Sequence, residues 1–282
     1  MYRQGTGLSY KKNMKYKSAK LVNNEGKMWH IGLDENDVGK HVILPADPNR
    51  CEMVAKHFDE ARLAAVSRGN PTYTGKYHDV DVSVMCTGMG AMAVSVAVEE
   101  LNHLGVKTMI RMGTSGSLQP NLPENCFVIA TGAIRGEGAS KEYISDEFPA
   151  IADVDVVCAL RKACEEYGVK PYLGIVRSHD SFYMESPGAH EGYMERIKQW
   201  EDAGALAVEN ESSALFTVGS LLGGIRTGTI LMCGGYLGNH YGSMSTSNKD
   251  NYQERVDLMT KITLRAIEII DKLPDLEDIR IK

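Results

Sequence analysis

Short apolar runs alternate with longer amphipathic stretches from residue 41 onward, and this alternation predicts an α/β fold. The apolar runs have the length of buried strands, and the stretches between them carry apolar residues at helical spacing. Predicted strands span 41–44, 62–67, 80–86, 108–112, 126–133, 172–177, 206–208 and 228–234. Predicted helices span 89–104, 155–167, 192–203, 212–222 and 251–273.

The organisation along the chain predicts one domain preceded by an arm. Residues 1–27 are polar and basic without a clear period, which is typical of a solvated arm. Residues 28–282 contain no internal repeat and no linker rich in Pro, Gly or Ser. We therefore expect a basic N-terminal arm over 1–27 and a single domain over 28–282.

Composition narrows the class of protein. The 282 residues are 43% hydrophobic, and 31 basic against 37 acidic residues give a net charge of −6, which argues against a nucleic-acid binder. The six cysteines include no C-x-x-C pair and are expected to be free thiols. No apolar run reaches the roughly 18 residues of a membrane span, and no signal peptide is visible. We expect a cytoplasmic protein that binds no membrane.

An arginine ends one predicted strand just before a run of small residues, in Ile-Arg-Met-Gly-Thr-Ser-Gly-Ser from residue 110. Arginine is costly to bury unpaired, and small residues let a ligand approach the backbone. A second arginine, Arg50, follows the turn Pro-Ala-Asp-Pro-Asn at the start of a helix, beside amides that suit an anion. Together Arg50 and Arg111 predict an anion site, although Asp-Pro-Asn is also ordinary turn chemistry.

Two further segments are candidates. Cys86 begins a strand-turn-helix segment with Gly88 and Gly90, but Ala93 replaces the third glycine of a dinucleotide fingerprint, which weakens that interpretation. In the second, Glu209 and Glu211 end a strand before a helix. A structural role is open there, with the glutamates offsetting the helix dipole and Ser212 capping the helix. A carboxylate that accepts two sugar hydroxyls is the alternative.

Other site types are less well supported. The histidines lack the spacing of zinc ligands, the methionines form no stripe, and the serines lack the context of a hydrolase nucleophile.

Five segments in order resemble the nucleoside phosphorylase-I family, in wording close to its uridine phosphorylases: PADPNR, CTGMGAMAVSVAVEEL, IRMGTSGSLQP, HDSFY and VENESSALF. The resemblance covers about residues 30–273. It implies a three-layer α/β/α fold around a mixed, partly closed sheet. It also implies reversible phosphorolysis of a nucleoside, with inorganic phosphate as co-substrate and no metal or other cofactor. Family members are usually homodimers that assemble into homohexamers with shared active sites.

The resemblance also assigns roles to residues. Arg50, Arg111 and Thr114 resemble the phosphate ligands, Ala46 stands where a glycine meets phosphate, and Arg68 resembles an arginine from the neighbouring subunit. Glu211 resembles the ligand of the ribose 2′- and 3′-hydroxyls, with Asn210 beside it. His30 resembles a histidine that reaches the 5′-hydroxyl from the partner. Arg111 and Glu211 are the expected catalytic residues. The expected base-binding residues are Phe182, Ser115, Gly116, Asn239 and His240.

The sequence departs from the family pattern where the base is read. The Gln-x-Arg pair of typical uridine phosphorylases is not visible after Tyr183, so His240 or His190 is expected to replace it. Leu237 stands where bacterial purine phosphorylases carry an aspartate, which lowers the purine alternative. We expect uridine phosphorolysis first, purine phosphorolysis second and phosphate-independent hydrolysis third. A nucleoside sensor without turnover and a Rossmann oxidoreductase stay open as other classes.

Overall fold

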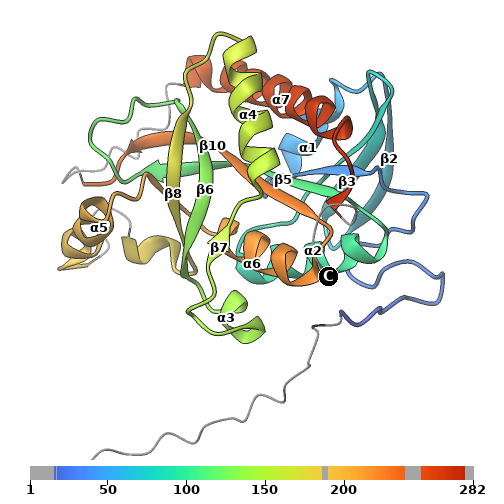
Figure 1. Ribbon diagram of the computed structural model, residues 1–282, viewed down its shortest axis with the longest axis horizontal. Coiled ribbons are helices and arrows are strands. Elements are labelled where there is room, and N and C mark those ends of the chain that lie inside the picture. The colour runs from blue at the N-terminus through green and yellow to red at the C-terminus, as the bar shows by residue number, and fades with distance from the viewer. Residues whose placement is uncertain (1–15, 17, 186–189, 239–248, 277–282) are drawn as a thin grey trace, which may run out of the picture.

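The computed structural model describes residues 16, 18–185, 190–238 and 249–276, and all structural statements refer to these. Strands and helices follow one another largely as the sequence pattern predicts (Figure 1). The strands are β1 His41–Leu44, β2 Glu60–Ser67, β3 Asn70–Tyr77, β4 Val80–Met85, β5 Thr108–Ser117, β6 Phe127–Gly136, β7 Ala150–Ile151, β8 Tyr172–His179, β9 Ala207–Glu209 and β10 Arg226–Tyr236. The helices are α1 Pro48–Ala55, α2 Ala91–His103, α3 Ala139–Tyr143, α4 Val154–Glu166, η1 Phe182–Glu185 (a 3-10 helix), α5 Tyr193–Asp202, α6 Ser212–Leu222 and α7 Lys249–Asp271.

Several predicted strand ends differ from the observed ones, and the largest difference lies at the arginine singled out above. The strand predicted over 108–112 continues to Ser117 as β5. Its small residues pair with β10 on one side, and Gly116 and Ser117 also pair with β9 on the other. Arg111 is therefore an internal strand residue, and the small residues after it are sheet. Strands β3 and β7 have no counterpart among the predicted elements.

The strands form one mixed sheet in which part of the order closes on itself. The sheet runs β10-β6-β8-β9-β5-β1-β4-β3-β2, and β10 also pairs with β5. The five strands β5, β10, β6, β8 and β9 thus form a closed ring, while β1, β4, β3 and β2 extend from it. The expected mixed, partly closed sheet is confirmed. Because β4, β1, β5 and β10 are parallel neighbours, their carboxyl ends meet at one edge.

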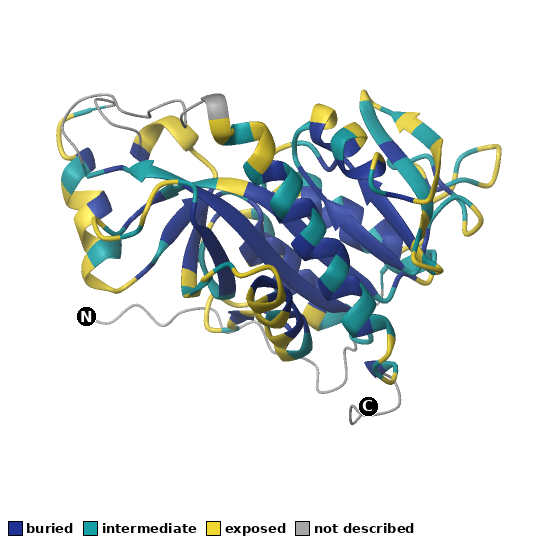
Figure 2. Ribbon diagram, turned by 90° about the horizontal axis from the view of Figure 1, so that it is seen from above, coloured by how far each residue is buried: buried dark blue, intermediate teal, exposed yellow. Residues whose placement is uncertain are grey.

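Alternate strand residues serve two helical layers. On β1, Ile43 packs into the core that contains residues of α1, α4 and α7, whereas Val42 and Leu44 pack into the core with α2 and α6. A strand buried on both faces reads as a continuous apolar run, which is why β1 was predicted with its observed bounds. Figure 2 shows the buried central strands between helices whose outer faces are less buried. The fold is the predicted three-layer α/β/α arrangement.

Candidate active site

The anion-site arginines lie near the carboxyl end of β1, where Leu44 pairs with Arg111 of β5. Arg111 lies within β5, and Arg50 lies in the first turn of α1, directly after the loop that follows β1. Asp47 caps α1 by accepting the backbone N–H of Asn49. Ligands of open α/β sheets bind outside the carboxyl ends of the strands, so this position fits an active site.

Arg111 is buried, with 4% of its surface exposed, and it is held by two glutamates. Its Nε donates to Glu209 Oε2 at 2.8 Å, and its Nη2 forms an ion pair with Glu211. Burial lowers the pKa of Arg111, but Glu211 and Glu209 outweigh it, so the pKa is raised overall. The protein therefore supplies anions for this arginine itself. Among the described residues, no group accepts a hydrogen bond from Nη1.

Arg50 is equally buried, and only the Nη atoms of its guanidinium are anchored by hydrogen bonds. Its Nη1 donates to the carbonyl of Met112 at 3.2 Å, and its Nη2 donates to the Tyr252 hydroxyl at 2.9 Å. Its Nε has no hydrogen-bond partner within the described part of the chain. The preceding Ala46 is partly buried, and its carbonyl accepts from the Cys86 thiol at 3.4 Å. The loops after β1 and β4 are thereby joined beside the two arginines.

Glu209 organises the site and caps helix α6. Besides Arg111, its carboxylate accepts the hydroxyl of Ser178 and the backbone N–H groups of Glu211 and Ser212, at 3.0 and 3.0–3.1 Å. The Ser212 cap considered from the sequence is wrong, because the hydroxyl of Ser212 bonds to Thr229 instead. A carboxylate at a helix N-terminus also complements the helix dipole.

Glu211 lies opposite the glycine turn that follows β4. Its Oε1 accepts the backbone N–H of Gly90 at 2.6 Å, and Gly90 has a φ of +96°, a conformation that favours glycine. Its Oε2 contacts Arg111 without hydrogen-bond geometry. Burial raises the pKa of Glu211 more strongly than Arg111 lowers it. One oxygen of this carboxylate thus keeps its hydrogen-bonding capacity.

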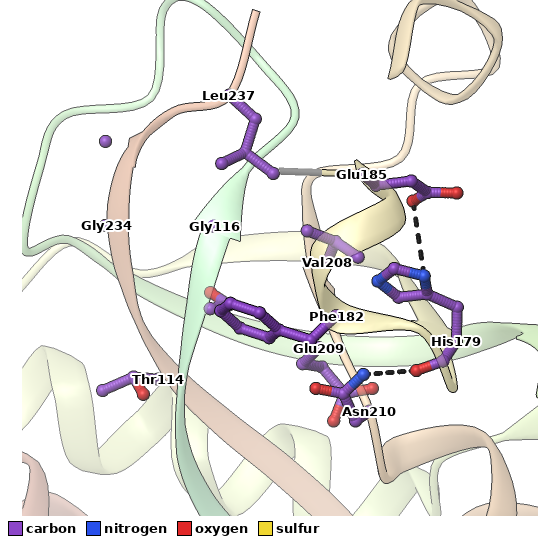
Figure 3. Close-up of a pocket in the computed structure, with 12 residues that line it drawn as sticks. Thr114, Gly116, His179, Phe182, Glu185, Val208, Glu209, Asn210, Gly234 and Leu237 are labelled. Atoms are coloured by element: carbon purple, nitrogen blue, oxygen red, sulfur yellow. Dashed lines mark hydrogen bonds and ion pairs between the residues drawn. The ribbon is translucent and has the colours of Figure 1, made fainter. Parts of the chain in front are cut away.

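A cavity of about 230 Å³ opens beside these residues (Figure 3). It brings together five residues predicted for the site: Thr114, Ser115, Gly116, Phe182 and Asn210. They come from β5, from η1 and from the turn after β9, so residues nearly 100 positions apart line one cavity. The amide of Asn210 donates to the backbone carbonyl of His179.

The cavity also contains a histidine and a glutamate that the sequence had not indicated. His179, at the end of β8, and Glu185, in η1, both line it. Figure 3 shows them together on one side, with Leu237 above and Thr114 on the opposite side. The signal in the sequence was the motif HDSFY at the carboxyl end of a predicted strand, because His179 is the first residue of this motif and Glu185 closely follows it.

Two predicted residues line a different cavity. His30 and exposed Arg68 border a cavity of about 190 Å³ with Cys86 and Thr87 from the end of β4. The imidazole Nδ1 of His30 lies 2.6 Å from the carboxylate of Glu100, which also accepts the backbone N–H of His30. Within one chain, His30 and Arg68 are therefore not lining residues of the Phe182 cavity.

The remaining base-reading predictions have different outcomes. Asn239 and His240 lie outside the described residues. His190 has its Nε2 at 3.0 Å from the carbonyl of Met184 and is not a lining residue of the Phe182 cavity. Leu237, the residue at the position of the purine-phosphorylase aspartate, is buried and forms part of the cavity wall.

Across the described ranges, no cluster of three or more His, Cys, Asp or Glu side chains has a geometry that could hold a metal ion. No helix in that part of the chain has the length and apolar character needed to cross a bilayer.

Comparison with known proteins identifies the family. The phosphorylase superfamily model matches residues 40–268. A uridine phosphorylase from Treponema pallidum is 45% identical over 217 residues, 76% of this chain and 84% of that protein. A guanosine phosphorylase from Halorubrum lacusprofundi is 34% identical over 244 residues, 86% of this chain and 98% of that protein.

Solved structures agree with the sequence relatives. The crystal structure of uridine phosphorylase from Vibrio fischeri superimposes with a TM-score of 0.76 at 31% identity, covering 89% of this chain and 100% of that one. On the motifs, the fold and these matches together, the chain belongs to the phosphorylase superfamily, as a nucleoside phosphorylase similar to uridine phosphorylases.

Proposed function

We propose that the chain is a pentosyltransferase that converts uridine and inorganic phosphate reversibly into uracil and α-ribose 1-phosphate. Several relatives of 32–45% identity are uridine phosphorylases, which supports uridine as the substrate. Phosphate is a co-substrate in this reaction, and we propose that no other cofactor takes part. The single observation that carries the proposal is the pair of buried arginines near the carboxyl end of β1, Arg50 at the start of α1 and Arg111 within β5.

The arginine pair has the chemistry of a phosphate site. Arg50 and Arg111 each keep one buried N–H group without a partner among the described residues, which is costly unless a ligand accepts it. Guanidinium groups suit a doubly charged oxyanion because they donate in-plane hydrogen bonds. We propose that phosphate accepts hydrogen bonds from these two N–H groups, from the Thr114 hydroxyl and from the backbone near Ala46.

The ribose is proposed to lie between this phosphate and the base cavity. Glu211 Oε2 contacts Arg111 without being aligned for a hydrogen bond, so it can accept the 2′- and 3′-hydroxyls. Asn210 lines the adjacent cavity wall. Phe182, Ser115 and Gly116 line the space that the uracil would occupy, with the half-exposed Phe182 ring packing against it.

The reaction then follows from charge placement. A phosphate oxygen forms a bond to the anomeric carbon while the bond from that carbon to uracil N1 breaks, and its electron pair leaves with the base. The sugar becomes oxocarbenium-like, and the adjacent phosphate dianion stabilises its positive charge in a site shielded from water. Arg111 and Glu211 hold nucleophile and sugar in register, which supplies much of the rate.

We further propose a homodimer with shared sites, assembled into a homohexamer. His30 and Arg68 border a cavity separate from the Phe182 cavity, which supports their acting on the site of a partner subunit. Mixing an Arg68→Ala variant with a Glu211→Gln variant tests this arrangement, because some mixed dimers would contain one intact site. Recovery of activity is expected, and its absence after confirmed subunit exchange would contradict shared sites.

Purine phosphorolysis is the second candidate, because the match to the guanosine phosphorylase covers 98% of that protein. Buried Leu237 disfavours it, since a purine leaving group gains from an acid that leucine does not provide. Base release from uridine, thymidine, inosine and guanosine, each with and without phosphate, decides between them. We expect uracil release only with phosphate. Faster guanosine cleavage would establish the purine reaction, and cleavage without phosphate would establish hydrolysis.

A further inference from the structure

The polar groups at one side of the Phe182 cavity have no role in the reaction proposed above. Three of the described lining residues have ionisable side chains: His179, Glu185 and Glu209. Glu209 is occupied by Arg111, Ser178 and the amides of α6. His179 and Glu185 therefore remain as the ionisable groups able to read a base in this cavity.

Glu185 is a fixed anion. It is 2% exposed, and the guanidinium of Arg177 donates to both of its oxygens, with Nε at 3.0 Å from Oε2 and Nη2 at 2.6 Å from Oε1. Arg196 adds a contact at 3.3 Å, and Arg177 itself lies over the ring of Trp200 at 4.2 Å. Burial raises the pKa of Glu185, but Arg177, His179 and Arg196 outweigh it and lower the pKa overall.

His179 faces this anion with one ring nitrogen. The imidazole is 5% exposed, and its Nδ1 lies 3.8 Å from Glu185 Oε2 without a hydrogen-bond partner among the described residues. Burial is the largest influence on the pKa of His179 and lowers it. Arg177 and Arg196 lower it further, whereas Glu185 and Glu209 raise it. The net lowering favours a neutral ring that carries one proton.

The position of that proton follows from the carboxylate. A neutral imidazole has one donor and one acceptor nitrogen, and a neighbouring carboxylate favours the tautomer that directs N–H toward it. The carboxylate of Glu185 therefore favours the tautomer with its proton on Nδ1, which leaves Nε2 as the acceptor. Figure 3 shows the imidazole between Glu185 and the part of the cavity bordered by Val208 and Phe182. The cavity thus presents a hydrogen-bond acceptor where the base is proposed to bind.

We propose that His179 selects the base by accepting the N3–H of uracil at Nε2, with Glu185 as the positioning residue that holds the Nδ1 proton. This inference rests on the proposed function for the identity of the base. Uracil and thymine carry an N–H at this position, whereas cytosine carries a lone pair. The histidine therefore replaces the Gln-x-Arg pair in recognising uracil. It rejects cytosine because Nε2 and the cytosine N3 are both hydrogen-bond acceptors.

Uridine and 3-methyluridine test the proposal directly, because methylation removes only the N3–H. We expect the wild-type kcat/KM to favour uridine strongly, and His179→Ala to reduce the ratio of the two kcat/KM values about tenfold or more, the loss typical of one buried hydrogen bond. A general structural defect would lower kcat/KM for both substrates alike and leave their ratio unchanged. His78→Ala, on an exposed residue that lines neither cavity, is the matched control. An unchanged ratio in His179→Ala, or a lost ratio in His190→Ala alone, would overturn the assignment.

Two measurements make the inference independent of turnover. Calorimetric binding of free uracil against 3-methyluracil requires no phosphorolysis, so it tests base reading even if the proposed reaction fails. The wild type should bind uracil about tenfold or more tightly than 3-methyluracil, and His179→Ala should bind the two about equally. Equal binding of the two bases by the wild type, or no detectable binding of uracil, would overturn the proposal. Nitrogen NMR of the His179 ring should show the Nδ1–H tautomer, and Glu185→Gln should shift the population toward Nε2–H. An Nε2–H tautomer in the wild type would contradict the assigned roles.

Discussion

Replacing Glu209 with glutamine should destabilise the fold, although glutamine has nearly the same shape as glutamate. The carboxylate accepts from Arg111, Ser178 and two backbone amides, which are all donors. The carboxamide of glutamine keeps one acceptor oxygen, but its NH₂ group replaces the other oxygen and would face hydrogen-bond donors. Glu209→Gln therefore removes a buried charge partner and leaves at least one buried N–H group without an acceptor.

The magnitude follows from the lost contacts. A hydrogen bond to a charged group contributes about 1.5–3 kcal/mol, and a buried donor left without a partner costs about 1–3 kcal/mol. Removing one partner of a buried ion pair costs about 3–5 kcal/mol in measured cases, in agreement with that sum. We expect the free energy of unfolding to fall by about 3–5 kcal/mol. For a chain of this size the melting temperature should fall by about 6–10 °C, because each kcal/mol corresponds to about 2 °C.

Thermal and urea unfolding of the purified variant measure this loss, at one protein concentration because assembly affects the midpoint. Glu211→Gln is the matched control, since it removes the same charge next to the same arginine. Glu211 accepts the backbone N–H of Gly90, and burial raises the pKa of its carboxyl, so Glu211→Gln should cost less stability than Glu209→Gln. A melting temperature of Glu209→Gln within about 2 °C of wild type would refute the role of Glu209, because it would correspond to about 1 kcal/mol.

Three further predictions concern the same site. Phosphate at about 100 times its dissociation constant should raise the free energy of unfolding by about 2.7 kcal/mol, and Arg111→Met should lose most of that gain in urea titrations; equal gains would place phosphate elsewhere. Gly116→Ala puts a Cβ 2.8 Å from Leu237 Cδ1, so it should push that side chain into the cavity and raise the KM for uridine; unchanged kinetics would contradict this cavity wall. The raised pKa of Glu211 means that its contribution is fully present below pH 4.5 and is lost as the pH rises through the folded-state value. Glu211→Gln should therefore gain stability relative to wild type between pH 4.5 and 8, and a constant difference in urea unfolding would contradict that direction.

Strand and helix positions were predictable where burial is two-sided or one helical face is apolar. β1 and α6 have their predicted bounds because both consist mainly of buried residues. β3 was missed because most of its side chains are only partly buried, so it carries no strong alternation. It is held by antiparallel pairing to β2 and β4, a main-chain interaction without an apolar signature in its sequence.

The site shows the same division between local and distant information. The motifs placed Arg50, Arg111 and Glu211 near the carboxyl ends of strands, and these three residues are in the same region of the fold. The sequence suggested that Arg111 needs an external anion, whereas the structure pairs it with two glutamates. Glu185 drew no attention because a lone glutamate in a divergent segment has no spacing that marks a function.

The sequence by itself determined the layered fold, the short motifs that contain the arginines and the family, because apolar periodicity and short motifs are local properties. Only the tertiary structure decided which charges meet. Arg111 and Glu209 are 98 residues apart, and their contact exists because β5 and β9 pair in the closed part of the sheet. The juxtaposition of His179 with Glu185 likewise depends on the 3-10 turn that returns the chain over the end of β8. Burial then makes these contacts consequential, because charges removed from water must find partners within the fold.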